Sequence, residues 1–167
     1  AQVSNYDGAY SWAVSTTAGS ASINGSGLVT VTGLNPGESA TVTFDYNISD
    51  GNGGTDTATV TVTVTGTEDA TDTNPDSAST DEDTAVTIDV LANDTDPDSS
   101  DNPLAVASVT QPTDANDGMV VNNGTDVTFT PGSNFQGLAV GESATTTFTY
   151  TTDTGETENV TVTINGV

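Results

Sequence analysis

The amino-acid sequence predicts an all-β protein built from two β-sandwich modules in tandem. Three observations support this prediction. Thr and Val alternate over long stretches, short motifs rich in Gly, Asn and Pro separate those stretches, and one block of sequence occurs twice. Alternation of polar and apolar β-branched residues with a period of two is typical of strands that bury one face. Many short strands divided by frequent turns are typical of β-sandwiches.

The alternating stretches give the expected strands in chain order. In the first module we expect strands at residues 9–16, 20–24, 28–32, 39–49 and 56–65. In the second module we expect strands at residues 85–90, 104–111, 119–122, 127–130, 143–150 and 159–164. Within TATVTVTVTG, Val60, Val62 and Val64 should share one face of a strand, because side chains two residues apart point the same way.

The repeated block indicates that the two modules are related. LNPGESATVTFDY at residues 34–46 returns as LAVGESATTTFTY at residues 138–150, with nine of thirteen residues identical. We therefore assign residues 1–67 to the first module, 68–84 to an acidic linker and 85–167 to the second module. A sandwich of this type usually has seven strands. The first module is expected to lack one or two N-terminal strands, which either lie outside the chain's boundary or come from another chain.

The composition excludes several classes of function. The formal net charge is −24, and the chain contains no Lys, Arg or His. Nucleic acid and anionic membrane surfaces are therefore not expected partners, because both are repelled by this charge. Without His, Lys or Cys, few side chains can act as acid, base or nucleophile. A two-carboxylate glycosidase needs an aromatic-lined cleft, which one Trp, four Tyr and four Phe supply poorly. We predict that the protein is not an enzyme.

The same composition suggests a location. There is no Cys, and no run of eighteen apolar residues that could span a membrane. The sequence starts at Ala1 rather than Met, which suggests a processed product or an excised segment. A chain without Cys, Lys or Arg suits an extracellular setting in salty water. We expect a cell-surface protein of a marine or halophilic prokaryote.

The acidic residues are unevenly distributed. Residues 1–67 hold five of the 24 acids, whereas the 34 positions from 68 to 101 hold twelve. Like charges repel unless ions screen or bridge them, and no side-chain cation is present. Calcium takes six to eight oxygen ligands with flexible geometry, and the absence of nitrogen and sulfur ligands argues against zinc and copper. We therefore expect Ca²⁺ as the cofactor.

Three groups of residues are candidate calcium ligands. The run DVLANDTDPDSSDN contributes Asp94, Asp96, Asp98 and Asp101. The junction between the modules contributes Glu68, Asp69, Asp81 and Glu82. The motif DGNGGTD contributes Asp50, Asn52 and Asp56, although a glycine-rich hairpin turn explains this motif somewhat better.

Long stretches of the second module resemble a known family. TDEDTAVTIDVLANDTDPD, FTPGSNFQG and FTYTTDTGETENVTVTI are similar to the cadherin-like and VCBS-type repeats of large bacterial surface adhesins. In the first module, LVTVTGLNPGESATVTF also resembles fibronectin type III domains. These resemblances imply immunoglobulin-like sandwiches whose joints are stiffened by calcium. They imply Glu82, Asp94, Asp96 and Asp98 as joint ligands, with Asp69 from the preceding segment.

The sequence therefore predicts an extracellular, calcium-binding repeat that acts as a stiffened spacer in a surface adhesin or fibre. Its expected partners are neighbouring repeats of the same protein or identical subunits. Two alternatives remain open. The first is a filament subunit whose incomplete first module accepts a strand from its neighbour. The second is a calcium-dependent carbohydrate-binding module, with glycans as partners.

Overall fold

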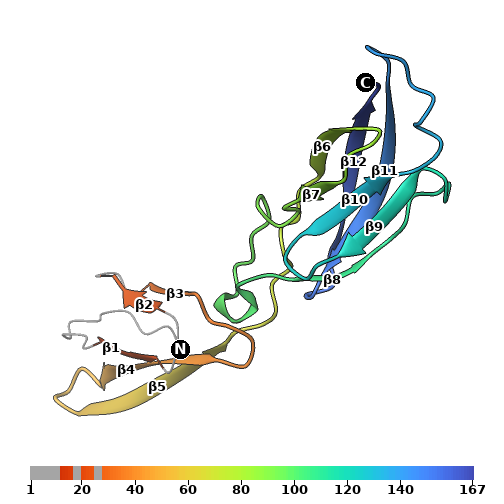
Figure 1. Cartoon of the computed structure of the whole chain (residues 1–167). Coiled ribbons are helices and arrows are strands. Elements are labelled where there is room, and N and C mark those ends of the chain that lie inside the picture. The colour runs from red at the N-terminus through yellow and green to blue at the C-terminus, as the bar shows by residue number, and fades with distance from the viewer. Residues whose placement is uncertain (1–11, 17–19, 25–27) are drawn as a thin grey trace. The chain divides into compact units, whose positions relative to one another are not determined.

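Strands form nearly all of the regular structure in this protein, as the sequence predicts. The computed structural model describes residues 12–16, 20–24 and 28–167, shown in Figure 1. Its contacts divide the chain into two units. The first unit covers Ala1–Glu68 and Asp98–Ser100, and the second covers Asp69–Pro97 and Asp101–Val167.

The first unit contains two small antiparallel sheets in its described part. One sheet has the strand order β1 (Trp12–Thr16), β4 (Ser39–Ser49) and β5 (Thr55–Thr65), and the other pairs β2 (Ser20–Ile23) with β3 (Val29–Thr32). The long β4–β5 hairpin follows from the strict Thr/Val alternation, and its ladder runs from Ser39↔Thr65 to Ser49↔Thr55. Residues 9–11 of the first expected strand lie outside the described residues.

The second unit is a sandwich of two sheets. One sheet has the order β6 (Asp76–Asp81), β12 (Thr157–Asn165), β11 (Ser143–Thr152) and β8 (Val106–Val109). The other has the order β7 (Val86–Ile88), β10 (Val127–Pro131) and β9 (Gly118–Asn122), and a 3-10 helix, η1, spans Ser99–Asp101. Twelve buried apolar residues form one core between the sheets, with the rings of Phe129 and Phe148 stacked 6.2 Å apart.

The structure differs from the sequence prediction in the expected linker, residues 68–84. Residues 76–81 form β6, which pairs in parallel with β12 from Asp76↔Val160 to Asp81↔Asn165 (Figure 1). This strand is hard to recognise in sequence because Ala78 is its one apolar residue, packed against the core. Its stability comes from the backbone ladder with β12, which is distant in sequence. The second unit therefore begins well before residue 85.

Candidate cation-binding site

Asp94, one of the predicted ligands in the second unit, is buried and hydrogen-bonded through both carboxylate oxygens. Its side chain is 8% exposed, in the loop that follows β7. One carboxylate oxygen accepts a hydrogen bond from the backbone N–H of Asn74 at 2.8 Å, and the other accepts one from the Tyr150 hydroxyl at 2.6 Å. Burial, followed by this hydrogen bond, raises the pKa of Tyr150 well above its usual range. Both oxygens of Asp94 therefore already have protein donors.

The loop that carries Asp94 is held in place by the segment that precedes β6. An antiparallel bridge joins Asp72 to Thr95, with N–H to carbonyl distances of 2.8 and 3.1 Å. The Asn74 side-chain amide also donates to the Asn93 carbonyl at 3.0 Å. These bonds bring the Asp-rich run against the start of the second unit. The loop is consequently positioned by its backbone, without needing an ion pair.

Asp76, at the start of β6, is a functional candidate that the sequence prediction missed. Its Oδ2 atom is buried and has no hydrogen-bond partner. The pKa of Asp76 is raised from 3.8 to about 6, first by burial and then by the negative charges of Asp94, Asp89 and Glu158, in that order. These four acids come from three segments of the second unit: β6, the loop after β7, and β12. An incoming proton or cation would therefore relieve repulsion at Asp76.

Asp96 lies in the same loop and contacts a different set of groups. Its Oδ2 accepts a hydrogen bond from the Thr71 hydroxyl at 2.5 Å, and the two hydroxyls of Thr71 and Thr154 lie 2.6 Å apart. The backbone carbonyl of Asp96 accepts a hydrogen bond from the Asn102 amide at 3.2 Å. Asp96 thus has neutral oxygen-bearing neighbours, which are the kind of ligand that calcium also uses.

Asp98 and Glu68 are brought together within the first unit. Asp98 is only 2% exposed, and carboxylate oxygens of these two residues lie within 4.8 Å of each other. Asp101 ends η1 and belongs to the second unit, and its Oδ2 atom is buried without a hydrogen-bond partner. The acidic run therefore contributes residues to both units, and its carboxylates have no side-chain cation to pair with.

Glu82 does not lie with Asp94, contrary to the grouping that the family resemblance implies. Both Glu82 oxygens accept hydrogen bonds from the backbone N–H of Val167 at 3.1 Å, beyond the far end of β6. Asp81, which pairs with Asn165 at that end, accepts a hydrogen bond from the Asp83 N–H at 3.0 Å. Six strand residues cover roughly 16 Å, and calcium–oxygen distances are about 2.3–2.6 Å. One calcium ion therefore cannot bind both Glu82 and Asp94.

The remaining predicted ligands are exposed. Asp69 lies at the start of the second unit. Asp50 closes the β4–β5 turn, where its Oδ1 accepts hydrogen bonds from the N–H groups of Asn52 at 2.7 Å and Gly54 at 2.9 Å. These bonds, that from Asn52 first, lower the pKa of Asp50. Asp56 accepts instead from the N–H of Thr57 at 2.9 Å. The carboxylates of this motif thus act within the hairpin turn and its strand.

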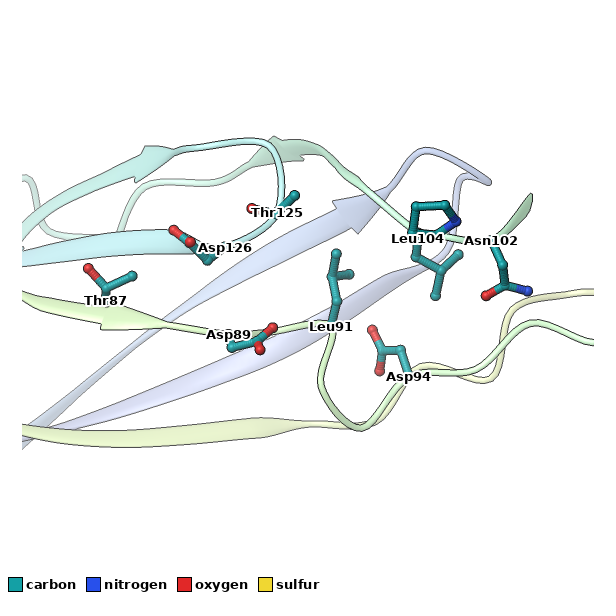
Figure 2. Close-up of a pocket in the computed structure, with 9 residues that line it drawn as sticks. Thr87, Asp89, Leu91, Asp94, Asn102, Leu104, Thr125 and Asp126 are labelled. Carbon is teal, nitrogen blue, oxygen red and sulfur yellow. The ribbon is translucent and has the colours of Figure 1, made fainter. Parts of the chain in front are cut away.

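A cavity of about 530 Å³ lies in the second unit beside the Asp-rich loop. Figure 2 shows the carboxylates of Asp89, Asp94 and Asp126 around it, together with the side chains of Leu91 and Leu104. The residues that line this cavity include no aromatic side chain. Its oxygen-rich lining suits a hard cation better than a sugar ring, which is usually bound against aromatic faces.

The donor set as a whole fits calcium and not a softer metal. Carboxylates, threonine hydroxyls, amides and backbone carbonyls surround the Asp-rich loop, and the sequence contains no His or Cys. Asp76 could have been recognised from the sequence only by its place after Pro75, at the start of a polar strand. Asp89 and Glu158 give no separate signal in sequence.

The fold and the acidic loop define a class of all-β, acidic, tandem sandwich proteins. The family model for the bacterial Ig domain matches residues 2–63 and again residues 68–165. The chain therefore belongs to the bacterial Ig domain family and carries two copies of the domain. A search of curated proteins finds no match. The second match begins at residue 68 and so includes β6, in agreement with the structure.

Membership of this family indicates a structural role. Bacterial Ig domains are non-enzymatic structural domains that typically occur as repeats in surface proteins and adhesins. Among the residues that the structure describes, no helix is long and apolar enough to cross a membrane.

Proposed function

We propose that this chain is a calcium-binding structural repeat of a bacterial surface adhesin, a spacer that is stiffened when calcium binds the acidic run of residues 89–102. The observation that carries the proposal is that Asp76 Oδ2 and Asp101 Oδ2 are buried without a hydrogen-bond partner, in a chain without side-chain cations. Buried carboxylates need donors or cations. The negative charges of Asp94, Asp89 and Glu158 beside Asp76 add to that requirement.

The acidic composition also supports an extracellular location in salty water, as on a marine or halophilic prokaryote. Extracellular calcium is available there at millimolar concentrations sufficient for weak sites. A stiffened spacer holds a binding domain away from the cell, and this use requires no catalytic group in the repeat.

Calcium titration tests the proposal. An ion that binds only the folded state stabilises it by about 2.7 kcal/mol at 100 times its dissociation constant. Calorimetry should detect calcium binding, and the melting temperature should rise with calcium more than with magnesium or sodium at matched ionic strength. Equal shifts with all three salts would indicate screening alone and would contradict the proposal.

Asp-to-Asn variants test which carboxylates cause the calcium-dependent rise in melting temperature. Asp96→Asn combined with Asp98→Asn keeps the side-chain volume but removes two charges, and should remove most of the calcium-dependent rise in melting temperature. Asp50→Asn is the matched control, because Asp50 lies in an exposed turn of the first unit. If the control loses as much of the response as the double variant, the acidic run is not the calcium site.

A second function is favoured by one specific observation. Val62 and Val64 on β5 are 45% and 38% exposed, which leaves an apolar face open among the described residues of the first unit. We propose as the alternative that the protein assembles into a filament by accepting a strand there. Sedimentation should then show assembly that increases with protein concentration, and a monomer at every concentration would exclude it. The aromatic-free cavity gives no comparable support to carbohydrate binding.

A further inference from the structure

Each unit contains its own long hairpin, and the two hairpins are closed by the same hydrogen bonds. The N–H of Gly66 donates to the Glu38 carbonyl at 2.9 Å, and the N–H of Gly166 donates to the Glu142 carbonyl at the same distance. The Glu38 and Glu142 side chains each accept a hydrogen bond at 2.9 Å from the N–H three residues earlier. Strand β5 of the first unit therefore corresponds to β12 of the second, residue 62 to residue 162 and residue 64 to residue 164.

The outer edges of these corresponding strands differ. Strand β12 lies between β11 and β6, whereas β5 is an edge strand among the described residues, because its sheet has the order β1-β4-β5. The chain that continues from β6 enters the other sheet as β7, and Ala78, Val86 and Ile88 all pack on the core of the second unit. Strands β6 and β7 precede β8 in the second unit, whereas residues 1–11, before the corresponding β1, lie outside the described residues.

From Thr57 onward, β5 also lacks the features that usually protect an edge. Exposed edges are commonly blocked by Lys, Pro, an inward charge or a bulge. From Thr57 to Thr65 the strand contains Thr, Val and Ala alone, and its ladder to β4 continues without a register shift. Residues 1–67 also hold only five acids, so an acidic segment meets less repulsion there than elsewhere on the chain.

We propose that the outer edge of β5 binds, in parallel, a strand from another polypeptide that has the residue pattern of β6 and β7. By analogy with Thr163↔Ser79, Thr63 lies opposite the position that corresponds to Ser79. The bound strand extends the sheet, and its apolar continuation covers Val62 and Val64. Backbone hydrogen bonds supply the affinity, and the small and apolar side chains supply the specificity. This inference specifies the site used in the strand-exchange alternative and rests on that alternative.

Disulfide cross-linking tests the site and its register, because the natural chain has no Cys. The chain with Thr63→Cys is mixed with a synthetic peptide of residues 76–90 that carries Ser79→Cys. A second peptide carries Ser77→Cys instead, two residues out of register. Cross-linking should be about tenfold greater with the first peptide, since strand register is set by the side-chain pattern. Equal cross-linking by both peptides would overturn the proposal.

The second unit supplies a matched control. In the chain with Thr163→Cys, the edge of β12 is already occupied by β6, so neither peptide should cross-link. Absence of cross-linking to Thr63→Cys in a folded chain, as judged by circular dichroism, would mean that the edge is closed or covered by residues 1–11, and would overturn the proposal. So would equal reaction of the two chains. Filaments seen by electron microscopy without this cross-link would preserve strand exchange but reject this site.

Discussion

The two units carry corresponding hairpins but bury them to different extents. Val162 and Ile164 on β12 are fully buried, whereas Val62 and Val64 at the same positions of β5 are 45% and 38% exposed. The hairpins have the same closing hydrogen bonds. The difference therefore arises from what covers them: β6, β7 and the sheet of β7, β10 and β9 in the second unit, and fewer strands among the described residues of the first. A strand pattern creates an apolar face, but only a second sheet buries it.

The largest expected effect comes from truncating the same position in both units. Ile164→Ala should destabilise the second unit by about 2–5 kcal/mol, because it leaves a cavity in a packed core. Val64→Ala should cost less than about 1 kcal/mol, because the side chain is already exposed. Calorimetric melting of both variants measures the difference. Equal losses would show that β5 is covered by something outside the described residues.

The second-largest effect is expected from removing the hydrogen bond between Tyr150 and Asp94 in the second unit. Tyr150→Phe removes a buried hydrogen bond to a carboxylate and should cost about 1.5–3 kcal/mol in denaturant unfolding. The control is the same change in an Asp94→Asn background, where the loss should be smaller. If both losses are the same, the two side chains do not act together.

A smaller effect concerns pH and Asp76. Its folded pKa of about 6 exceeds its ordinary value of 3.8, so the folded state binds more protons between these pH values. In calcium-free buffer, the free energy of unfolding should therefore fall as pH rises from about 4 to above 6, by on the order of 1 kcal/mol after solvent screening. Asp76→Asn should flatten this slope in urea titrations at several pH values. If the slope does not change, other carboxylates cause the pH dependence of the free energy of unfolding.

The smallest effect compares the two hairpin turns. Asp50→Ala removes the acceptor for two turn N–H groups, so the Gly54 amide should exchange with deuterium faster, with little change elsewhere. The lowered pKa of Asp50 means that this support is present above its ordinary pKa of 3.8 and is lost as pH falls below it.

Thr152, which is buried and bonded to Glu156 across the other turn, should be less tolerant of replacement by Val.

Much of this fold is predictable from sequence because the alternation is local. Strands β4, β5, β11 and β12 follow the Thr/Val pattern to within two residues at each end. Strand β6 was not predictable in this way, because it is polar and its ladder with β12 joins residues about 84 positions apart. Tertiary pairing stabilises it where local propensity does not.

The candidate site was predictable only in part. Clustering of acids points to Asp94, Asp96 and Asp98, but the sequence gives no sign that Asp94 accepts hydrogen bonds from Tyr150 and Asn74. Asp76 escapes prediction because its environment is made by residues such as Glu158, far along the chain. Acidic residues that lie close together in the sequence also need not bind the same ion. Glu82 and Asp94 are separated in the structure because Glu82 lies beyond the far end of β6.

The parallel pairing of β6 with β12 has a mechanical consequence for a chain under tension. The strand that begins the second unit and the strand that ends it lie side by side and point in the same direction (Figure 1). A pull between Asp76 and Asn165 therefore acts along both strands and loads their shared hydrogen bonds together in shear. Antiparallel neighbours joined by a hairpin would instead open one bond at a time. The second unit is accordingly arranged to resist force applied through its first and last strands.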